Sequence, residues 1–344
     1  MAEHSQVGKV GAMNRRFGVF FALALCLAGV AAPRIGCAQS RTSAAKSSQV
    51  KTPQLVWIDT DIGDDIDDAF ALGLVLRSPE LKPLGISTAF GDTETRARLV
   101  DRYLAAVGRQ SIPVTAGVHT ETPNVLTQRA YAEQAPEKKH ADGVAAMLEA
   151  IRKYPNQITL LAIGPLFNIG AAIDRDPATF HKLKGVVIMG GSIVRGYDGK
   201  NGERRPADAE WNILCDPKGA AKLFTSGVPI FMMPLDSTQI HLLEPERKAL
   251  FAAGNPLTTQ LDLLYQEWSA KASGHPQTPT LFDPVAAAYT FRPELCPMTP
   301  MRIEVDAKGF TRKVDGAPNA QVCLKSDEGA FLTLLQGRLE GSGK

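Results

Sequence analysis

The sequence has little excess charge and few cysteines. Its 344 residues carry a formal net charge of only +2, and no long basic or acidic tail occurs. This balance argues against a protein that binds nucleic acid electrostatically. The five cysteines form no CxxC pair, which argues against a disulfide scaffold and a zinc site. P-loop, GxSxG and HExxH motifs are also lacking, which removes three common enzyme classes.

The first 38 residues have the pattern of an export signal. Arg15 and Arg16 precede the apolar run FGVFFALALCLAGVAA, and a small-residue cleavage motif ends at Ala38. The run is short for a helix that spans a bilayer. We therefore expect residues 1–38 to be a cleaved signal peptide and the mature protein to be periplasmic or secreted, without stable membrane association. The alternatives are an uncleaved anchor helix and a lipid on Cys37.

The cysteines that remain after cleavage are few and unpaired by any motif. They are Cys215, Cys296 and Cys323. We expect them to be small buried hydrophobic side chains. One disulfide with one free thiol is the alternative.

The rest of the chain alternates between short apolar runs and longer helical patterns. A Ser-, Lys- and Thr-rich lead-in at 39–53 is predicted to be disordered. The predicted strands are 55–59, 84–89, 158–163, 185–190 and 229–233. The predicted helices are 67–77, 93–107, 142–153, 166–174, 217–225 and 257–272. Because the strands are apolar on both faces, we predict a single α/β domain over 54–344, with a mostly parallel sheet flanked by helices.

Six aspartates fall within ten positions of the segment LVWIDTDIGDDIDDAFALGLVL, at the end of the first predicted strand. Ligands of open α/β sheets bind beyond the carboxyl ends of the strands. Burying repelling carboxylates is costly unless a hard cation such as Ca²⁺ neutralises them. The alternative is a solvated turn with acids at a helix N-terminus. It would explain Asp67 and Asp68, but not also Asp61 and Asp65.

The segment DTDIGDDIDDAFAL resembles the N-terminal signature of the inosine–uridine preferring nucleoside hydrolase family. Five later segments resemble that family in the same order: STAFGDTETRA, KKHADGVAAML, LLAIGPLFNIGAAI, VVIMGG with AEWNILCDPKGA, and LFDPVAAAY. The resemblance covers about residues 54–337. It implies a Rossmann-like, mostly parallel mixed sheet, and Ca²⁺-dependent hydrolysis of the N-glycosidic bond of ribonucleosides to free base and ribose.

The resemblance also implies roles for individual residues. The implied calcium ligands are Asp61, Asp68, Asp283 and the main-chain carbonyl of Ile163. The implied ribose and sugar-side contacts are Asp92, which stands where the family has Asn, together with Met189, Glu210 and Asn212. Asp67 is the implied general base. The loop before it is longer than in the family, so Asp65 is either an added ligand or the base instead.

Phe282 stands where the family has a histidine that protonates the leaving base. Phenylalanine cannot donate a proton, so another group must activate the leaving base. His140 aligns with a base-side histidine of the family and is our expected catalytic donor, with His275 as a second candidate. Phe282, Trp268 and Tyr265 are expected to stack against the base.

The leading hypothesis is an exported, calcium-dependent nucleoside N-ribohydrolase that acts in purine or pyrimidine salvage. A metal-dependent phosphatase is a second possibility, in which Asp59 would be phosphorylated during turnover. A third is a non-catalytic nucleoside- or ribose-binding protein on the same fold. The preferred base stays open, and the resemblance leaves both a homodimer and a homotetramer.

Overall fold

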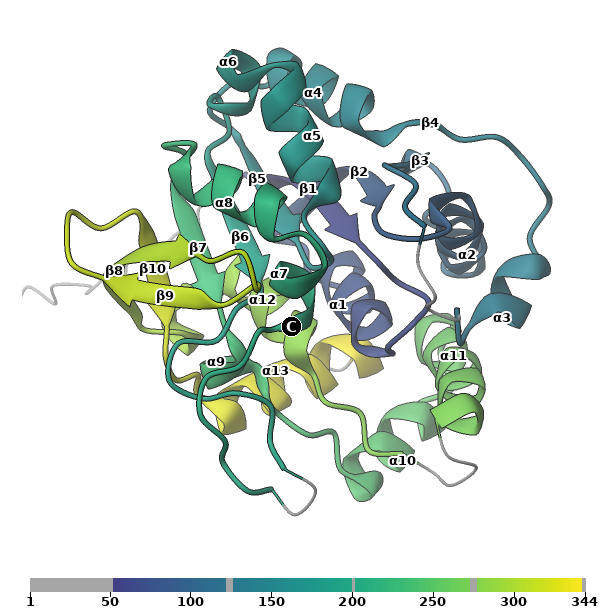
Figure 1. The fold of residues 1–344 in the computed structure, drawn as a ribbon. Helices are drawn as coiled ribbons and strands as arrows, with labels where there is room; N and C mark the ends of the chain where they lie inside the picture. The colour runs from purple at the N-terminus through teal and green to yellow at the C-terminus, as the bar shows by residue number, and fades with distance from the viewer. Residues whose placement is uncertain (1–51, 122–125, 200–201, 273–276, 342–344) are drawn as a thin grey trace, which may run out of the picture. The chain divides into compact units, whose positions relative to one another are not determined.

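A 10-stranded mixed sheet organises the described part of the chain, which comprises residues 52–121, 126–199, 202–272 and 277–341 of a computed structural model (Figure 1). The predicted signal peptide and His275 lie outside these residues. The strands are β1 (Gln54–Thr60), β2 (Leu81–Thr88), β3 (Val114–Ala116), β4 (Ala141–Asp142), β5 (Ile158–Ala162), β6 (Gly185–Met189), β7 (Ile230–Met233), β8 (Met298–Val305), β9 (Thr311–Val314) and β10 (Ala320–Cys323). Their order across the sheet is β4-β3-β2-β1-β5-β6-β7-β10-β8-β9.

Most neighbouring strands are parallel, and only β8 pairs antiparallel with β10 and β9. The five strands predicted from sequence correspond to β1, β2, β5, β6 and β7. The mostly parallel mixed sheet is therefore confirmed. The antiparallel end with β8 and β9 was not predicted. Its strands contain many exposed or half-buried residues and therefore carry a weaker apolar signal.

The helices are α1 (Asp67–Leu76), α2 (Thr93–Ala106), α3 (Arg129–Glu133), α4 (Gly143–Lys153), α5 (Phe167–Arg175), α6 (Pro177–Phe180), α7 (Trp211–Cys215), α8 (Pro217–Thr225), α9 (Leu235–Thr238), α10 (Glu244–Ala252), α11 (Pro256–Ala272), α12 (Phe282–Tyr289) and α13 (Glu328–Glu340), with a 3-10 turn η1 at Pro293–Leu295. The six predicted helices correspond to α1, α2, α4, α5, α8 and α11. No helix among the described residues is long and apolar enough to cross a membrane.

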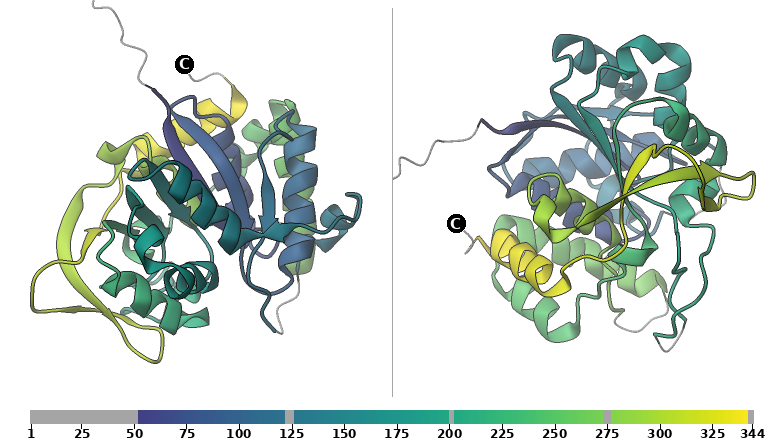
Figure 2. Two further views of the ribbon diagram at one scale, coloured as in Figure 1. Left: turned by 90° about the horizontal axis from the view of Figure 1, so that it is seen from above. Right: turned by 90° about the vertical axis from the view of Figure 1, so that its left-hand side faces the viewer.

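Helices cover both faces of the sheet (Figure 2). Successive residues of β1 alternate between two apolar cores because side chains alternate across a strand. Ile58 packs with α1 residues such as Phe70, whereas Trp57 packs with α4 residues such as Met147. The two cores hold the sheet rigidly between helical layers, which fixes the positions of the strand ends.

The strand order reverses direction at β1. From β1 the chain continues to β2 on one side and reaches β5 on the other. A crevice forms at such a switch point, beyond the carboxyl ends of the two strands. Helix α1 begins there, after the aspartate-rich loop, and packs against α12. Two distant segments thus bring their N-terminal turns together at the same edge.

Cys296 and Cys323 form a disulfide, and Cys215 has a free thiol. The expectation that all three are unpaired hydrophobic residues was wrong. Cys296 follows η1 and Cys323 ends β10, which lie 27 residues apart in sequence. Only the packing of η1 near the end of that strand brings the two sulfur atoms together.

Candidate active site

A cavity of about 320 Å³ lies beyond the carboxyl ends of β1, β5 and β6. Its lining combines acidic side chains, residues at the ends of two strands and a wall of aromatic rings. The lining residues are Asp61, Asp64, Asp65, Asp67, Asp68, Ile163, Met189, Tyr197, Glu210, Trp211, Asn212, Phe282 and Asp283. Every metal-ligand candidate from the sequence lines this cavity, as do Asp67 and most of the expected substrate contacts.

A buried arginine holds the aspartate-rich loop in place. The Arg96 guanidinium donates to the carbonyl oxygens of Asp61 and Ile62 and pairs with the Asp64 carboxylate at 2.8 Å. Its Nε donates to the Phe90 carbonyl oxygen at 2.8 Å. Sequence reasoning missed this residue. The available signal was the place of Arg96 on the apolar face of α2. It shares this face with Leu99, Val100 and Tyr103, which follow at i+3, i+4 and i+7.

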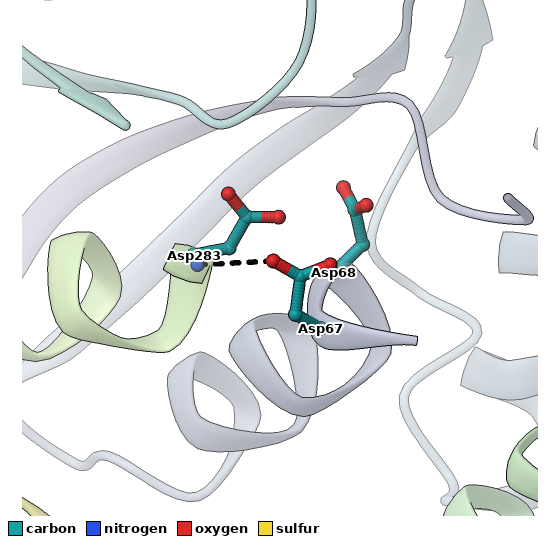
Figure 3. A group of neighbouring side chains, drawn as sticks. All are labelled: Asp67, Asp68 and Asp283. Carbon is teal, nitrogen blue, oxygen red and sulfur yellow. Dashed lines mark hydrogen bonds between the residues drawn. The ribbon is translucent and has the colours of Figure 1, made fainter. Parts of the chain in front are cut away.

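Three carboxylates converge from two helix N-termini (Figure 3). Asp67 and Asp68 lie in the first turn of α1, and Asp283 lies in the first turn of α12. One carboxylate oxygen of each lies within 4.8 Å of the other two. The Asp283 main-chain N–H donates to Asp67 Oδ2 at 3.3 Å, and the Thr60 hydroxyl donates to Asp68 Oδ1. We call Asp67, Asp68 and Asp283 the carboxylate group.

This group is strongly destabilised when all its members are ionised. Each side chain is almost fully buried, and burial followed by the neighbouring carboxylates raises all three pKa values well above the usual range. Burial also raises the pKa of Asp61 to about 7. A bound cation would remove the repulsion and restore ionisation. Because every side-chain donor is a carboxylate oxygen, the residues fit a hard divalent cation.

The group differs from the ligand set that the sequence suggested. Asp68 and Asp283 belong to both sets. The third carboxylate of the group is Asp67, whereas the sequence suggested Asp61 and Asp65. Asp61 is buried in the cavity wall beside Gly164. A Cβ added to Gly164 would lie 2.8 Å from a carboxylate oxygen of Asp61. Asp65 is exposed, and its carboxylate accepts from its neighbour's N–H, that of Ile66, at 2.7 Å.

Glu210 and Asn212 are held rigidly in the opposite wall. The Glu210 carboxylate accepts the main-chain N–H groups of Gly191 at 2.8 Å and Asn212 at 2.9 Å, and burial raises its pKa to about 7. The Asn212 amide donates to the carbonyl oxygens of Met189 at 3.1 Å and Ile163 at 3.5 Å. These bonds connect the strand ends of β5 and β6 to the start of α7.

The aromatic wall contains two residues that sequence reasoning missed, Tyr197 and Trp211. Tyr197 meets Phe282 edge to face, with ring centroids 6.2 Å apart. The Trp211 main-chain N–H donates to the Tyr197 hydroxyl oxygen at 2.9 Å, and the indole is 41% exposed. Trp211 could have been found between Glu210 and Asn212. Tyr197 lies in an irregular segment that carries no local signal.

Asp92, Trp268 and Tyr265 were expected to contact substrate but do not line the cavity. Asp92 caps α2 by accepting from Thr95 N–H at 3.1 Å and pairs with Arg129 at 3.2 Å. Trp268 packs against Tyr265, with ring centroids 5.9 Å apart. Their expected contacts with substrate are therefore not supported by the geometry.

His140 is the main correction. It directly precedes β4, the outermost strand, which β3 and β2 separate from β1. Its ring lies between Glu94, at 2.7 Å from Nδ1, and Asp101, at 2.8 Å from Nε2. Both ring nitrogens are thus engaged away from the cavity. The family resemblance suggested that His140 lies near the base. That expectation failed because the order of residues along the chain does not reveal where an edge strand lies.

Asp59 is also unavailable for chemistry. It is fully buried within β1, where it accepts hydrogen bonds from the Ser87 hydroxyl and, at 2.7 Å, the Asn168 amide. A phosphate could not reach this carboxylate without opening the sheet. The phosphatase interpretation is therefore not supported.

Comparison with known proteins agrees with this geometry. Residues 56–333 match the family model described as inosine-uridine preferring nucleoside hydrolase. The pyrimidine-specific ribonucleoside hydrolase RihA of Citrobacter koseri is 32% identical over 317 residues, which cover 83% of this chain and 97% of that protein. RihA of Shigella boydii is 31% identical over 318 residues, or 83% and 98% of the two chains.

Solved structures show the same fold. A plant nucleoside hydrolase, PpNRh1, has a TM-score of 0.72 at 25% identity over 84% of this chain and 99% of its own. The purine-preferring ribonucleoside hydrolase from Gardnerella vaginalis has a TM-score of 0.72 at 24% identity, over 84% and 98% of the two chains.

Proposed function

This chain belongs to the inosine–uridine preferring nucleoside hydrolase family, and we propose that it hydrolyses the N-glycosidic bond of ribonucleosides to free base and ribose. The observation that carries the proposal is the cavity itself. Buried carboxylates form one side, Glu210 and Asn212 form another, and Phe282, Tyr197 and Trp211 form an apolar wall. A nucleoside has matching parts: a polyhydroxylated sugar and a flat aromatic base.

We further propose that the site binds one Ca²⁺. Asp68 and Asp283 would be side-chain ligands, Ile163 would contribute its carbonyl oxygen, and carboxylates of the 61–67 loop would complete the shell. The support is the all-oxygen donor set and the repulsion within the carboxylate group. When bound, the cation supplies positive charge that keeps the carboxylates ionised and polarises its ligands.

Different side chains are proposed for proton transfer and for ribose binding. We propose Asp67 as the acceptor of the proton from the attacking water, because its carboxylate lines the cavity at the start of α1. Asp65, the alternative base from the sequence, and Asp61 also line the cavity and are the competing candidates, since Asp67 lies within the carboxylate group. Glu210 and Asn212 would contact the ribose hydroxyls. The nearby negative charges stabilise an oxocarbenium-like sugar as the base departs.

The deciding experiment measures ribose release by the purified protein. The substrates are inosine, adenosine, guanosine, uridine and cytidine, each with calcium and with a chelator. We expect release from at least one nucleoside, loss of release with the chelator, and recovery when calcium is restored. Release that chelation leaves unchanged would contradict the metal proposal. Nucleoside binding without any release would contradict hydrolysis and favour a binding protein.

The proton acceptor is tested by asparagine variants. Asp67→Asn should lower kcat by about 100-fold or more while calcium stays bound, because the amide cannot take a proton. Asp262→Asn, which changes an aspartate of α11 outside the cavity, is the matched control and should behave as wild type. An active Asp67→Asn protein together with an inactive Asp65→Asn or Asp61→Asn protein would move the role to the residue whose variant is inactive.

We also propose that the protein acts outside the cytoplasm, on the support of the export pattern in residues 1–38. The N-terminal sequence of protein recovered from the extracytoplasmic fraction would identify cleavage after Ala38. A mass that retains the leader would contradict it. Light scattering would distinguish a monomer from the homodimer or homotetramer expected for the family.

A further inference from the structure

Breaking the N-glycosidic bond leaves an electron pair on the base, and a poor leaving group needs a proton there. This requirement rests on the proposed function. Phe282 occupies the aromatic wall of the cavity and has no proton to give. Histidine, lysine, arginine and cysteine are absent from the described residues that line the cavity. The donor must therefore be sought among the few remaining polar side chains.

Three lining side chains carry an N–H or O–H besides the acids: Tyr197, Trp211 and Asn212. The Asn212 amide already donates to the carbonyl oxygens of Met189 and Ile163. Indole and amide N–H groups donate hydrogen bonds but do not transfer protons near neutral pH. The tyrosine hydroxyl is the one group of the three that can transfer its proton; burial and the nearby Glu210 raise its pKa, so the hydroxyl stays protonated until the base departs.

The acids of the cavity have other partners or other proposed roles: Asp64 pairs with Arg96, and Asp61 and Asp65 belong to the loop that would complete the shell of the cation. Glu210 accepts main-chain N–H groups on both oxygens, from Asn212 on Oε1 and from Gly191 on Oε2. These bonds favour its role as an acceptor in the wall. Asp68 and Asp283 belong to the proposed cation site, and Asp67, which faces them, is the proposed proton acceptor. A donor separate from that group is needed on the side where the aromatic base would stack.

The contacts of Tyr197 suit a proton donor at this position. Its hydroxyl oxygen accepts the Trp211 main-chain N–H at 2.9 Å, so its own proton stays available for a second partner. Its ring meets the Phe282 ring edge to face at 6.2 Å. The phenol is thereby anchored beside the residue that lacks a proton, on the wall that would receive the base.

We propose that Tyr197 is the proton donor to the leaving base. The C1′–N bond breaks and its electron pair passes to the base, which takes the proton from the Tyr197 hydroxyl. Water adds to C1′ and loses its proton to the carboxylate acceptor. The phenolate regains a proton from solvent as the acceptor releases one. The balance is nucleoside plus water giving base and ribose.

Leaving-group chemistry tests the proposal. Tyr197→Phe should lower kcat by about 100-fold or more on any nucleoside that the wild type cleaves, the usual scale of general-acid catalysis. It should leave 4-nitrophenyl β-D-ribofuranoside within about threefold, because 4-nitrophenolate departs without a proton. Tyr154→Phe, which changes a tyrosine outside the cavity, is the matched control.

Each result has one meaning. Equal losses on both substrates would show that Tyr197 only positions α7 through Trp211, and no loss on either would show that it is not the donor. Adding Phe282→His to Tyr197→Phe should restore nucleoside cleavage by at least about tenfold, because a donor returns to the same wall; no restoration would count against the proposal. If the wild type cleaves no nucleoside, the proposed function fails before this question arises.

A second variant protects the test against misfolding. Replacing Tyr197 by 3-fluorotyrosine keeps the ring, the hydroxyl and the Trp211 contact, and makes the phenol more acidic. Because the donor proton is kept, kcat for nucleosides should stay at least about tenfold above that of Tyr197→Phe. A kcat as low as that of Tyr197→Phe would overturn the proposal.

Discussion

Two acidic regions of this protein differ in what neutralises them. In the carboxylate group, Asp67, Asp68 and Asp283 face one another, and burial with mutual repulsion raises their pKa values. On the outer side of α2, Asp101 meets His140 at 2.8 Å and Lys138 at 2.7 Å. Burial opposes ionisation there as well, but the bonds from His140 and Lys138 hold the pKa of Asp101 below its usual range.

The comparison separates a structural cluster from a functional one. The cluster around His140 carries its own cations, so it stabilises the fold and needs nothing from outside. The carboxylate group has no matching cation among the described residues that line the cavity. Such unfavourable charge persists where function requires it, and the proposed metal ion would account for it.

The largest expected effect comes from removing one member of the carboxylate group. Asp283→Asn should weaken calcium binding by more than about 100-fold, the upper range for residues that merely support metal ligands. Without metal the variant should be more stable than wild type, because one repelling buried charge is gone. Calorimetric titration with calcium and urea unfolding in chelator measure the two effects. Asp101→Asn is the matched control, and wild-type calcium affinity in Asp283→Asn would contradict the assignment.

Arg96 is the cation that the aspartate-rich loop does possess. Arg96→Met should lower the free energy of unfolding by about 3 kcal/mol, because Asp64 and three main-chain carbonyls lose a buried partner. Activity should fall as well, since the loop carries Asp61. Urea unfolding compares it with Arg98→Met, which removes a more exposed arginine of the same helix and should cost below about 1 kcal/mol. Equal losses would mean that the loop does not depend on Arg96.

Calcium added to chelator-treated protein should raise the melting temperature. Binding to the folded state alone stabilises it by about 2.7 kcal/mol at a calcium concentration 100 times Kd. The increase should survive in His140→Gln and disappear in Asp283→Asn. Differential scanning calorimetry measures all three proteins. A calcium-dependent increase that persists in Asp283→Asn would place the ion elsewhere.

The smallest expected effect is at His140. Burial favours the neutral ring, but the hydrogen bonds that the protonated ring donates to Asp101 and Glu94 raise its pKa above 6.5. Because the folded-state pKa is the higher one, this stabilisation is fully present below pH 6.5 and is lost as pH rises through the raised value. His140→Gln should therefore cost about 1 kcal/mol at mildly acidic pH, since its partners are partly exposed, and less at alkaline pH.

Urea unfolding across that pH range checks the loss, and kcat should stay within about twofold of wild type, because the ring does not line the cavity. A large fall in kcat with unchanged folding would return His140 to the catalytic machinery.

Much of the central fold was predictable because its signals are local. Apolar β-branched runs marked five of the parallel strands, and amphipathic periods marked the helices between them. The aspartates after β1 announced a site, because acids next to buried strands are costly. The roles of Arg96 and Tyr197 were not predictable. Arg96 contacts a loop about 35 residues away, and Tyr197 acquires its neighbours from α7 and α12.

The sequence by itself determined the alternating α/β architecture, the family resemblance and the acids at the first strand end, since each depends on residues close together along the chain. Tertiary structure alone decided that Asp67, and not Asp61 or Asp65, lies with Asp68 and Asp283, that His140 lies at the sheet edge, and that Cys296 pairs with Cys323. The physical reason is that these contacts follow from how helices and strands pack, and a chain's local pattern does not encode which distant side chains then meet.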